Sequence, residues 1–194
     1  MMIRLPSEGE LILASKSPRR RELLAEMGLT FTILTRETDE SYSEELTPRE
    51  AARFLSEKKA RAVAEIAPKD AIILASDTIV DVGGVALGKP ENAEDAKRML
   101  RALSGRAHYV HSGVCVMQNG RVLSDVDSTA VHFHPLTEEQ IDWYVGTGEP
   151  MDKAGAYGIQ GLGGRLISHF EGEMDTVIGL PCKMVAGLLE ELSK

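Results

Sequence analysis

The sequence predicts an α/β fold built around a mixed β-sheet. Apolar runs of strand length occur at 11–14 and 71–75. In this half of the chain helical patterns separate the strands, which favours parallel pairing. Later in the chain, Asn119-Gly120 joins two extended segments, and this dipeptide is the strongest short signal for an antiparallel hairpin. The 194 residues suit one domain, so we expect residues 1–194 to form a single unit.

The first expected strand leads into a helix whose first turn is basic. Ser17 followed by Pro18 is typical of a helix N-cap and its first helical position. Arg19 and Arg20 then lie in the first turn, where free backbone N–H groups favour anions. Positive side chains oppose the helix dipole there. We therefore interpret the segment that begins at Ser15 as a phosphate site, with a solvated basic helix end as the alternative.

A second helix, from Thr47 to about residue 66, carries a lysine on its apolar side. Projected at about 100° per residue, Lys59 falls in the same stripe as Leu55 and Ala62. An ammonium group on an inward face is costly unless a partner or a cleft receives it. Lys59 therefore either snorkels to the rim of the helix or reaches into a site, and the pattern alone leaves both open.

The run at 71–75 is typical of a central strand, and Asp77 is expected at or near its C-terminal end. A carboxylate at that place normally faces the ligand-binding crevice of an open α/β sheet, although Asp77 could instead cap a nearby turn. The further elements expected are a helix at 92–105, extended segments at 109–118 and 121–133, a helix at 137–146, a hairpin of 165–170 and 174–178, and a helix at 181–192.

Two other places have unusual chemistry. Five glycines among residues 155–164 allow a close backbone approach to a ligand, and Gln160 within them could bond the edge of a base. Lys153 supplies a positive charge just before them. Lys89 stands between a glycine and a proline, but no phosphate-loop pattern precedes it, so by itself it is typical of a surface loop.

Charge and composition exclude several classes of partner. With 22 basic and 30 acidic residues the net charge is −8, which disfavours binding to nucleic acid polymers or anionic membranes. No apolar run approaches the length of a membrane span, and Cys115 and Cys182 are expected to be reduced core thiols, so we expect a cytoplasmic protein. His132 and His134 alternate on one strand face without a nearby carboxylate or cysteine in the sequence, which favours exposed strand residues over a metal site.

Taken together, these segments resemble the Maf family of nucleoside triphosphate pyrophosphatases over essentially the whole chain. The family implies an elongated α/β domain of two lobes around a mixed sheet, with a deep nucleotide-binding cleft. It also implies hydrolysis of a nucleoside triphosphate to the monophosphate and pyrophosphate with a divalent cation, Mg²⁺ or Mn²⁺. The matching segments are Ser15-Lys16-Ser17-Pro18-Arg19-Arg20, Ser76-Asp77-Thr78-Ile79-Val80, Gly88-Lys89-Pro90, 152–161 and Val177-Ile178-Gly179-Leu180-Pro181.

The resemblance also implies a substrate and a set of site residues. Arg19, Thr78 and Gln160 agree with the branch of the family that hydrolyses dTTP and UTP. Asp77 is implied as the proton acceptor and, with Glu40, as a metal ligand. One departure from the family pattern is Asp175-Thr176 before Val177, which leaves the contacts of that loop open. The predicted substrate-binding residues are Ser15, Arg19, Arg20, Lys59, Thr78, Lys89, Lys153 and Gln160.

Two rival functions stay open at this stage. One is a nucleotide- or RNA-binding module without catalysis, although only 5% of the chain is aromatic and RNA binders usually present stacking aromatics. The other is a housecleaning pyrophosphatase that prefers other, modified nucleotides. Whichever nucleotide such a pyrophosphatase prefers, its expected partner is a small triphosphate. A homodimer is a further expectation.

Overall fold

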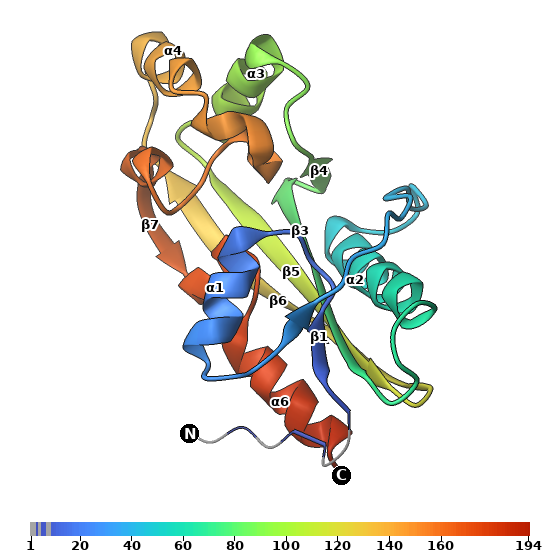
Figure 1. The fold of residues 1–194 in the computed structure, drawn as a ribbon. Helices are drawn as coiled ribbons and strands as arrows, with labels where there is room; N and C mark the ends of the chain where they lie inside the picture. Colours follow the sequence, from blue (N-terminus) through green and yellow to red (C-terminus); the bar gives the residue numbers. More distant parts are fainter. Residues whose placement is uncertain (1–2, 4, 7–8) are drawn as a thin grey trace.

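A mixed β-sheet runs the length of the elongated molecule (Figure 1). The computed structural model describes residues 3, 5–6 and 9–194. In these residues the sheet has seven strands, and the predicted mixed sheet is confirmed because β1 pairs parallel with β2 and β3 whereas the other pairs are antiparallel. In order across the sheet the strands are β2 (Thr32–Ile33), β1 (Leu11–Leu13), β3 (Ile72–Val82), β5 (Ala107–Gln118), β6 (Arg121–Phe133) and β7 (Ile167–Glu171), with β4 (Val85–Leu87) beside β3.

Helices cover both faces of the sheet and build a second lobe at its far end (Figure 1). The first four helices along the chain begin at the N-caps Ser17, Thr47, Asn92 and Thr137, whose side chains each accept a backbone N–H of the first turn. The helices are α1 (Pro18–Glu26), α2 (Pro48–Ala64), α3 (Ala93–Leu103), α4 (Glu138–Gly146), α5 (Met174–Ile178) and α6 (Cys182–Leu192), with short 3₁₀ turns η1 (Glu149–Asp152), η2 (Ala154–Ala156) and η3 (Leu162–Leu166).

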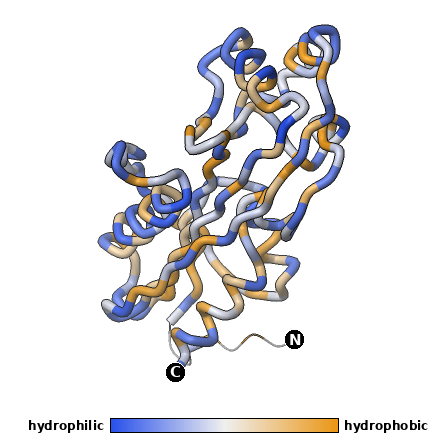
Figure 2. The backbone as a smooth tube through the Cα atoms, turned by 180° about the vertical axis from the view of Figure 1, so that it is seen from behind, coloured by the Kyte–Doolittle hydropathy of each residue, from blue (hydrophilic) through white to orange (hydrophobic). Residues whose placement is uncertain are grey.

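The apolar core is divided between the two faces of the sheet and the second lobe. Leu24 of α1 and Leu189 of α6 pack on one face, and Val63 of α2 packs on the other. In the second lobe, Leu100 of α3 and Tyr144 of α4 pack around the far ends of β5 and β6. Figure 2 shows the hydrophobic segments concentrated along the central strands, with hydrophilic residues on the outer loops.

Both cysteines are free, as predicted, and burial raises the pKa of each thiol to about 12. Cys115 is buried in the sheet, whereas Cys182 is only half-buried at the start of α6. Within the described part of the chain, none of the helices has the length and apolar character needed to cross a membrane.

One edge of β3 is interrupted, and this gap defines the floor of a cleft. β1 pairs with β3 as far as Leu74, and β4 begins its pairing at Val80. Between these points, among the residues that the structure describes, β5 alone pairs with β3, along its other edge. Asp77 and Thr78 lie in the gap. Asp77 was expected at or near the strand end, with extended chain after it. The long ladder with β5 makes this extension part of β3 up to Val82, so that Asp77 is in mid-strand.

A glycine lets α2 lie directly on the sheet next to this gap. Gly113 of β5 is the register partner of Asp77, and a Cβ atom at Gly113 would lie 2.2 Å from the carbonyl oxygen of Ala52 in α2. Lys59 follows Ala52 by seven residues (59 − 52), or about two helical turns, and so returns to the same side of α2. The close packing therefore fixes the height of Lys59 above Asp77.

The prediction of a hairpin from 165–170 and 174–178 is wrong for the second strand, because Met174–Ile178 is the helix α5. Thr129 of β6 donates its hydroxyl to the carbonyl of Glu173 and accepts the N–H of the same residue, at 2.9 and 3.0 Å. The chain therefore cannot continue as a ladder beyond Gly172, whose φ of 131° makes the turn. The β-branched residues at 176–178 indicated a strand, but contacts with β5 and β6 override that local preference.

We predict that Gly113→Ala destabilises the protein, because the added methyl group meets the backbone of α2. Overpacking of this kind costs about 1–3 kcal/mol of unfolding free energy. The matched control is Gly187→Ala, at a helical position of α6 where an added Cβ meets nothing within 4 Å. That change should be neutral or stabilising by up to about 1 kcal/mol. Urea unfolding measures both, and equal stability of the two variants would contradict the packing argument.

Candidate active site

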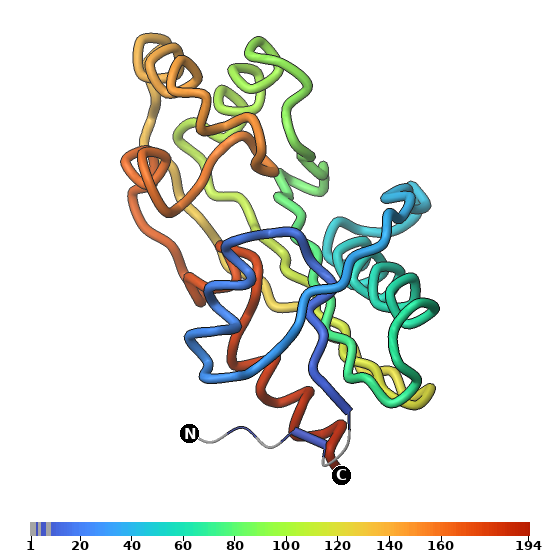
Figure 3. The backbone as a smooth tube through the Cα atoms, in the orientation of Figure 1, coloured from blue at the N-terminus to red at the C-terminus, as the bar shows by residue number. Residues whose placement is uncertain are grey.

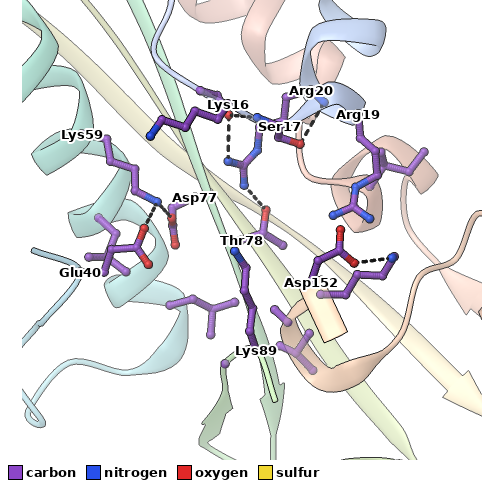
Figure 4. A pocket seen from close by; sticks show the side chains of 18 of the residues that line it. Lys16, Ser17, Arg19, Arg20, Glu40, Lys59, Asp77, Thr78, Lys89 and Asp152 are labelled. Atoms are coloured by element: carbon purple, nitrogen blue, oxygen red, sulfur yellow. Dashed lines mark hydrogen bonds and ion pairs between the residues drawn. The ribbon is translucent and has the colours of Figure 1, made fainter. Parts of the chain in front are cut away.

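A deep cleft of about 940 Å³ opens over the gap in β3. Its walls come from the start of α1, from α2 with the segment before it, from the loop after β4 and from the glycine-rich segment (Figures 1 and 4). The cleft brings together all of the residues predicted to form a site. These lining residues are Ser15, Arg19, Arg20, Glu40, Lys59, Asp77, Thr78, Lys89, Lys153 and Gln160.

At the floor of the cleft, one lysine joins two carboxylates (Figure 4). The ammonium of Lys59 forms ion pairs with Asp77 and, at 2.9 Å, with Glu40. The hydrogen bond from Lys59 lowers the pKa of Glu40, with further help from the charges of Lys59, Lys89 and Arg20, against the opposing effect of burial. Of the two possibilities for Lys59, snorkelling is therefore excluded, and the lysine reaches into the cleft.

This group of residues fits a divalent metal ion. Two carboxylates that converge on one small cation offer the oxygen donors that Mg²⁺ and Mn²⁺ prefer. Magnesium in particular is usually held by one or two carboxylates together with substrate phosphates rather than by a full protein cage. Glu40 is largely exposed, whereas Asp77 is buried and lies within β3.

Arg20 holds the cleft together rather than facing it freely. Its Nε donates to the carbonyl oxygen of Gly179 at 2.8 Å, and its guanidinium also donates to Thr78 at 3.0 Å and, more weakly, to Ser15 at 3.5 Å. Burial lowers the pKa of Arg20, and Asp77 partly opposes this effect. The contact with Gly179 joins segments that are 159 residues apart in the chain and lie side by side in Figure 3.

The hydroxyl of Thr78 belongs to the same framework. Ser112 of β5 donates its proton to the carbonyl of Thr176 at 2.7 Å, so it can only accept from Thr78, at 2.9 Å. Thr78 thus donates to Ser112 and accepts from Arg20. Its hydroxyl proton is already used, and the chain of bonds ties β3, β5, α1 and α5 together.

Arg19, in contrast, has unused hydrogen-bonding capacity. Its Nε is buried and has no partner among the described residues. Its guanidinium lies above Asp152 in Figure 4, and its charge helps to lower the pKa of that carboxylate. A buried guanidinium N–H without a partner is rare and costly. Arg19 is therefore ready to bind an anion that enters the cleft.

Two more lysines point into the cleft without partners (Figure 4). Lys16 and Lys89 form no ion pair or hydrogen bond with any residue that the structure describes, and both line the cleft. Lys16 was not among the residues predicted to bind the substrate. Its position in the loop before α1, rather than in the helix, directs its long side chain across the cleft towards Lys59.

Glu149 organises the glycine-rich segment, although no pattern in the sequence indicated this role. Its two carboxylate oxygens accept the N–H groups of Leu162 and Gly163 at 3.0 and 2.9 Å and the hydroxyl of Tyr144 at 2.9 Å. Burial opposes its charge, but these hydrogen bonds outweigh that effect and lower the pKa of Glu149. The backbone carbonyl of Glu149 also accepts the ammonium of Lys153 at 2.7 Å.

Lys153 consequently helps to hold this segment in place. Its ammonium bonds Glu149 and Asp152, which leaves little of it free for a ligand. Gln160, by contrast, is exposed at the rim of the cleft. Arg19 and Gln160 line both the cleft and a smaller adjoining hollow of about 280 Å³ beside α1 and α5.

The departure at Asp175 has a structural explanation. One oxygen of its carboxylate accepts the N–H of Cys182 at 2.9 Å, and its backbone carbonyl accepts the N–H groups of Gly179 and Leu180. Asp175 therefore fixes the turn between α5 and α6, which presents the carbonyl of Gly179 to Arg20. The aspartate contributes to the frame of the cleft and does not line it.

Fold and site together define an α/β protein with a deep cleft that cationic side chains line, built over paired carboxylates. The chain belongs to the family described as Maf-like protein, whose model matches residues 10–192. It is 50% identical to the dTTP/UTP pyrophosphatase of Anaeromyxobacter dehalogenans (strain 2CP-C), over 92% of each chain. It is also 50% identical to the dTTP/UTP pyrophosphatase of Moorella thermoacetica, over 93% of each chain. The relative of the same name in Bacillus velezensis is 44% identical, over 94% of this chain and 96% of its own.

Solved structures show the same fold at low identity. The Staphylococcus aureus Ham1 protein aligns with a TM-score of 0.53 at 14% identity, over 94% of this chain and 98% of that one. A HAM1 protein from Coxiella burnetii aligns with a TM-score of 0.50 at 16% identity, over 95% of this chain and 100% of that one. These likenesses confirm the predicted elongated α/β architecture around a mixed sheet.

We predict that Glu149→Gln loosens the glycine-rich segment, because an amide has one acceptor oxygen in place of two. Loss of these charged hydrogen bonds should cost about 1–3 kcal/mol of unfolding free energy at neutral pH. The carboxylate has a lowered pKa, so its contribution is present above about pH 4.5 and is lost as the pH falls through the lowered value. The stability curves of the variant and the parent protein should therefore converge in acid. The exposed Glu44→Gln is the control, and a constant difference between the curves would contradict the assignment.

We predict that Arg19→Ala weakens the binding of inorganic tripolyphosphate by about 10- to 100-fold, because it removes the guanidinium that has a free buried donor. Arg21→Ala is the matched control, since Arg21 is exposed two residues later and does not line the cleft. Isothermal titration calorimetry measures both affinities. Equal losses in the two variants would mean that Arg19 acts only through net charge.

Proposed function

We propose that this chain is a nucleoside triphosphate pyrophosphatase that hydrolyses dTTP and UTP, and related modified pyrimidine nucleotides, to the monophosphate and pyrophosphate. The observation that carries the proposal is the Glu40–Lys59–Asp77 group at the floor of a cleft that unpartnered cations surround. The names of relatives at 44–50% identity support the same activity and substrates.

In the proposed reaction, water attacks the α-phosphorus as the bond from that phosphorus to the bridging oxygen breaks. The new P–O bond yields the monophosphate, and pyrophosphate leaves with the bridging oxygen. Asp77 accepts the proton of the attacking water and later releases it to solvent. Lys59 holds the carboxylate of Asp77 in place through its ion pair. The chain of hydrogen bonds through Thr78 keeps the β3 backbone fixed under the reacting phosphate.

A divalent cation, Mg²⁺ or Mn²⁺, held by Glu40 and Asp77 would polarise the phosphate and neutralise developing charge. Side chains of the protein itself would neutralise the remaining negative charge of the triphosphate. Arg19, Lys16 and Lys89 have free donors that reach into the cleft. They would bind the non-bridging oxygens and stabilise the leaving pyrophosphate.

Gln160 and Arg19 are proposed to select the base. The Gln160 amide both donates and accepts, so it can pair with the carbonyl and N–H edge that uracil and thymine share. Both residues line the hollow next to the cleft as well as the cleft itself, which gives a planar ring a place beside the phosphates. Thr78 contributes to this selection only indirectly. Its hydroxyl is hydrogen-bonded to Arg20 and Ser112, and it helps to hold this part of the cleft in place.

The proposed partner is therefore a single small triphosphate in the cytoplasm. The net charge of −8 disfavours nucleic acid polymers, as the sequence indicated. The homodimer stays a prediction, which sedimentation analysis addresses.

We predict that Asp77→Asn lowers the turnover of dTTP and UTP by about 10²- to 10⁴-fold, because it removes the proton acceptor. Release of pyrophosphate from a panel of canonical and modified nucleoside triphosphates, with Mg²⁺ or Mn²⁺, measures activity and preference together. Asp70→Asn, on an exposed loop outside the cleft, is the control. Thermal unfolding checks that the variant is folded. Near-normal turnover in Asp77→Asn would overturn the role of Asp77, and binding without hydrolysis in the parent protein would indicate a binding module instead.

A further inference from the structure

Three potential metal ligands meet on the outer edge of the sheet, away from the cleft. His132 of β6 is the direct register partner of His169 in β7, and Glu171 follows two residues later on the same face. One ligand atom from each of the three side chains lies within 4.8 Å of the other two. The Nε2 atoms of His132 and His169 are 3.4 and 3.9 Å from Oε1 of Glu171.

The hydrogen bonds around His169 fix which of its nitrogens is free. The hydroxyl of Ser168 donates its only proton to the carbonyl oxygen of His132, at 3.2 Å. It can then only accept from Nδ1 of His169, at 2.9 Å, so Nδ1 carries the proton of the neutral ring. The lone pair of His169 is therefore on Nε2, the nitrogen that faces Glu171. An outer partner that holds the ring by its other nitrogen is typical of metal-binding histidines.

The rest of this face leaves room for an ion. The two imidazole rings are stacked with centroids 4.0 Å apart and an interplanar angle of 13°. The register neighbours on the same face are Ala107, opposite His132, and Ala130, opposite Glu171, and both are small. Exposure of the side chains rises from 28% at His132 to 58% at His169 and 71% at Glu171, so solvent has access to one side of the group.

We propose that His132, His169 and Glu171 form a binding site for a divalent transition-metal ion of the Zn²⁺ class, separate from the cleft. Two imidazole nitrogens and one carboxylate oxygen are a common three-ligand set for zinc, which completes its tetrahedron with water. The all-oxygen set at Glu40 and Asp77 suits Mg²⁺ and Mn²⁺ instead. The chain therefore separates two kinds of metal ion by ligand chemistry.

The place of the group in the fold explains what the ion would stabilise. In the described part of the chain, β7 is an edge strand that pairs only with β6. It ends directly before Gly172 and α5, whose last residues line the cleft. An ion bound between His132 and the two β7 ligands would join the edge strand to the sheet. Binding to the folded state alone would then raise the midpoint of thermal unfolding.

The test measures Zn²⁺ affinity by calorimetry on the metal-free full chain, with excess Mg²⁺ present to occupy the cleft. We expect the parent protein to bind a single equivalent of Zn²⁺, and Zn²⁺ to raise its unfolding midpoint. His169→Ala and Glu171→Gln should each weaken the affinity by at least about tenfold. His134→Ala is the matched control, because it removes an exposed histidine of the same segment that lies outside the group.

Cobalt provides a second readout that does not depend on stability or activity. Co²⁺ in the proposed site should give visible absorption bands typical of a four-coordinate ion, which His169→Ala should abolish and Asp77→Asn should leave intact. Basal pyrophosphatase activity with Mg²⁺ should be the same in His169→Ala and the parent protein. Equal Zn²⁺ affinity in the His169 and His134 variants, or loss of Zn²⁺ binding only in Asp77→Asn, would overturn the proposal.

Discussion

The interrupted edge of β3 is the constraint on which the cleft depends. Because β1 stops at the level of Leu74 and β4 starts at Val80, a central strand is left open along one side while β5 pairs with its other side. Successive side chains of a strand point to opposite faces. Asp77 therefore meets Lys59 of α2 on one face, and Thr78 meets Arg20 of α1 on the other. Two adjacent residues thus link the floor of the cleft to both helical layers.

Part of the positive charge of the cleft is held in ion pairs. Lys59 is held by Asp77 and Glu40, and Lys153 is held by Asp152. Such pairs keep cationic side chains in a partly buried cleft at a lower electrostatic cost than isolated charges. Arg19, Lys16 and Lys89 have no ion-pair partner among the residues that the structure describes, and they are the groups with capacity for an entering anion. The net charge of −8 disfavours large polyanions. A small anion that entered the cleft would meet these three cationic side chains.

Local patterns in the sequence were sufficient for the features that one element determines by itself. The N-cap at Ser17 and the apolar stripe of α2 placed Arg19 and Lys59 correctly, because helix periodicity fixes the direction of each side chain. Features that depend on pairing between distant strands were not accessible in this way. The sequence shows no carboxylate or cysteine close to His132, but the register with β7 brings His169 and Glu171 beside it. Glu149 is a similar case, since its role depends on a loop that folds back onto it.

The two arginines at the start of α1 show how neighbouring residues of the same type acquire different functions. Consecutive helical residues point about 100° apart, so only one of the pair can face the body of the protein. Arg20 takes that direction, and its bonds to Gly179 and Thr78 connect the first and last segments of the fold. Arg19 then projects over the cleft with a buried donor unused. The positive charge at this helix start, which opposes the helix dipole, is thus offset on one side by carbonyl and hydroxyl acceptors within the fold. The charge of Arg19 would be compensated by an anion bound in the cleft.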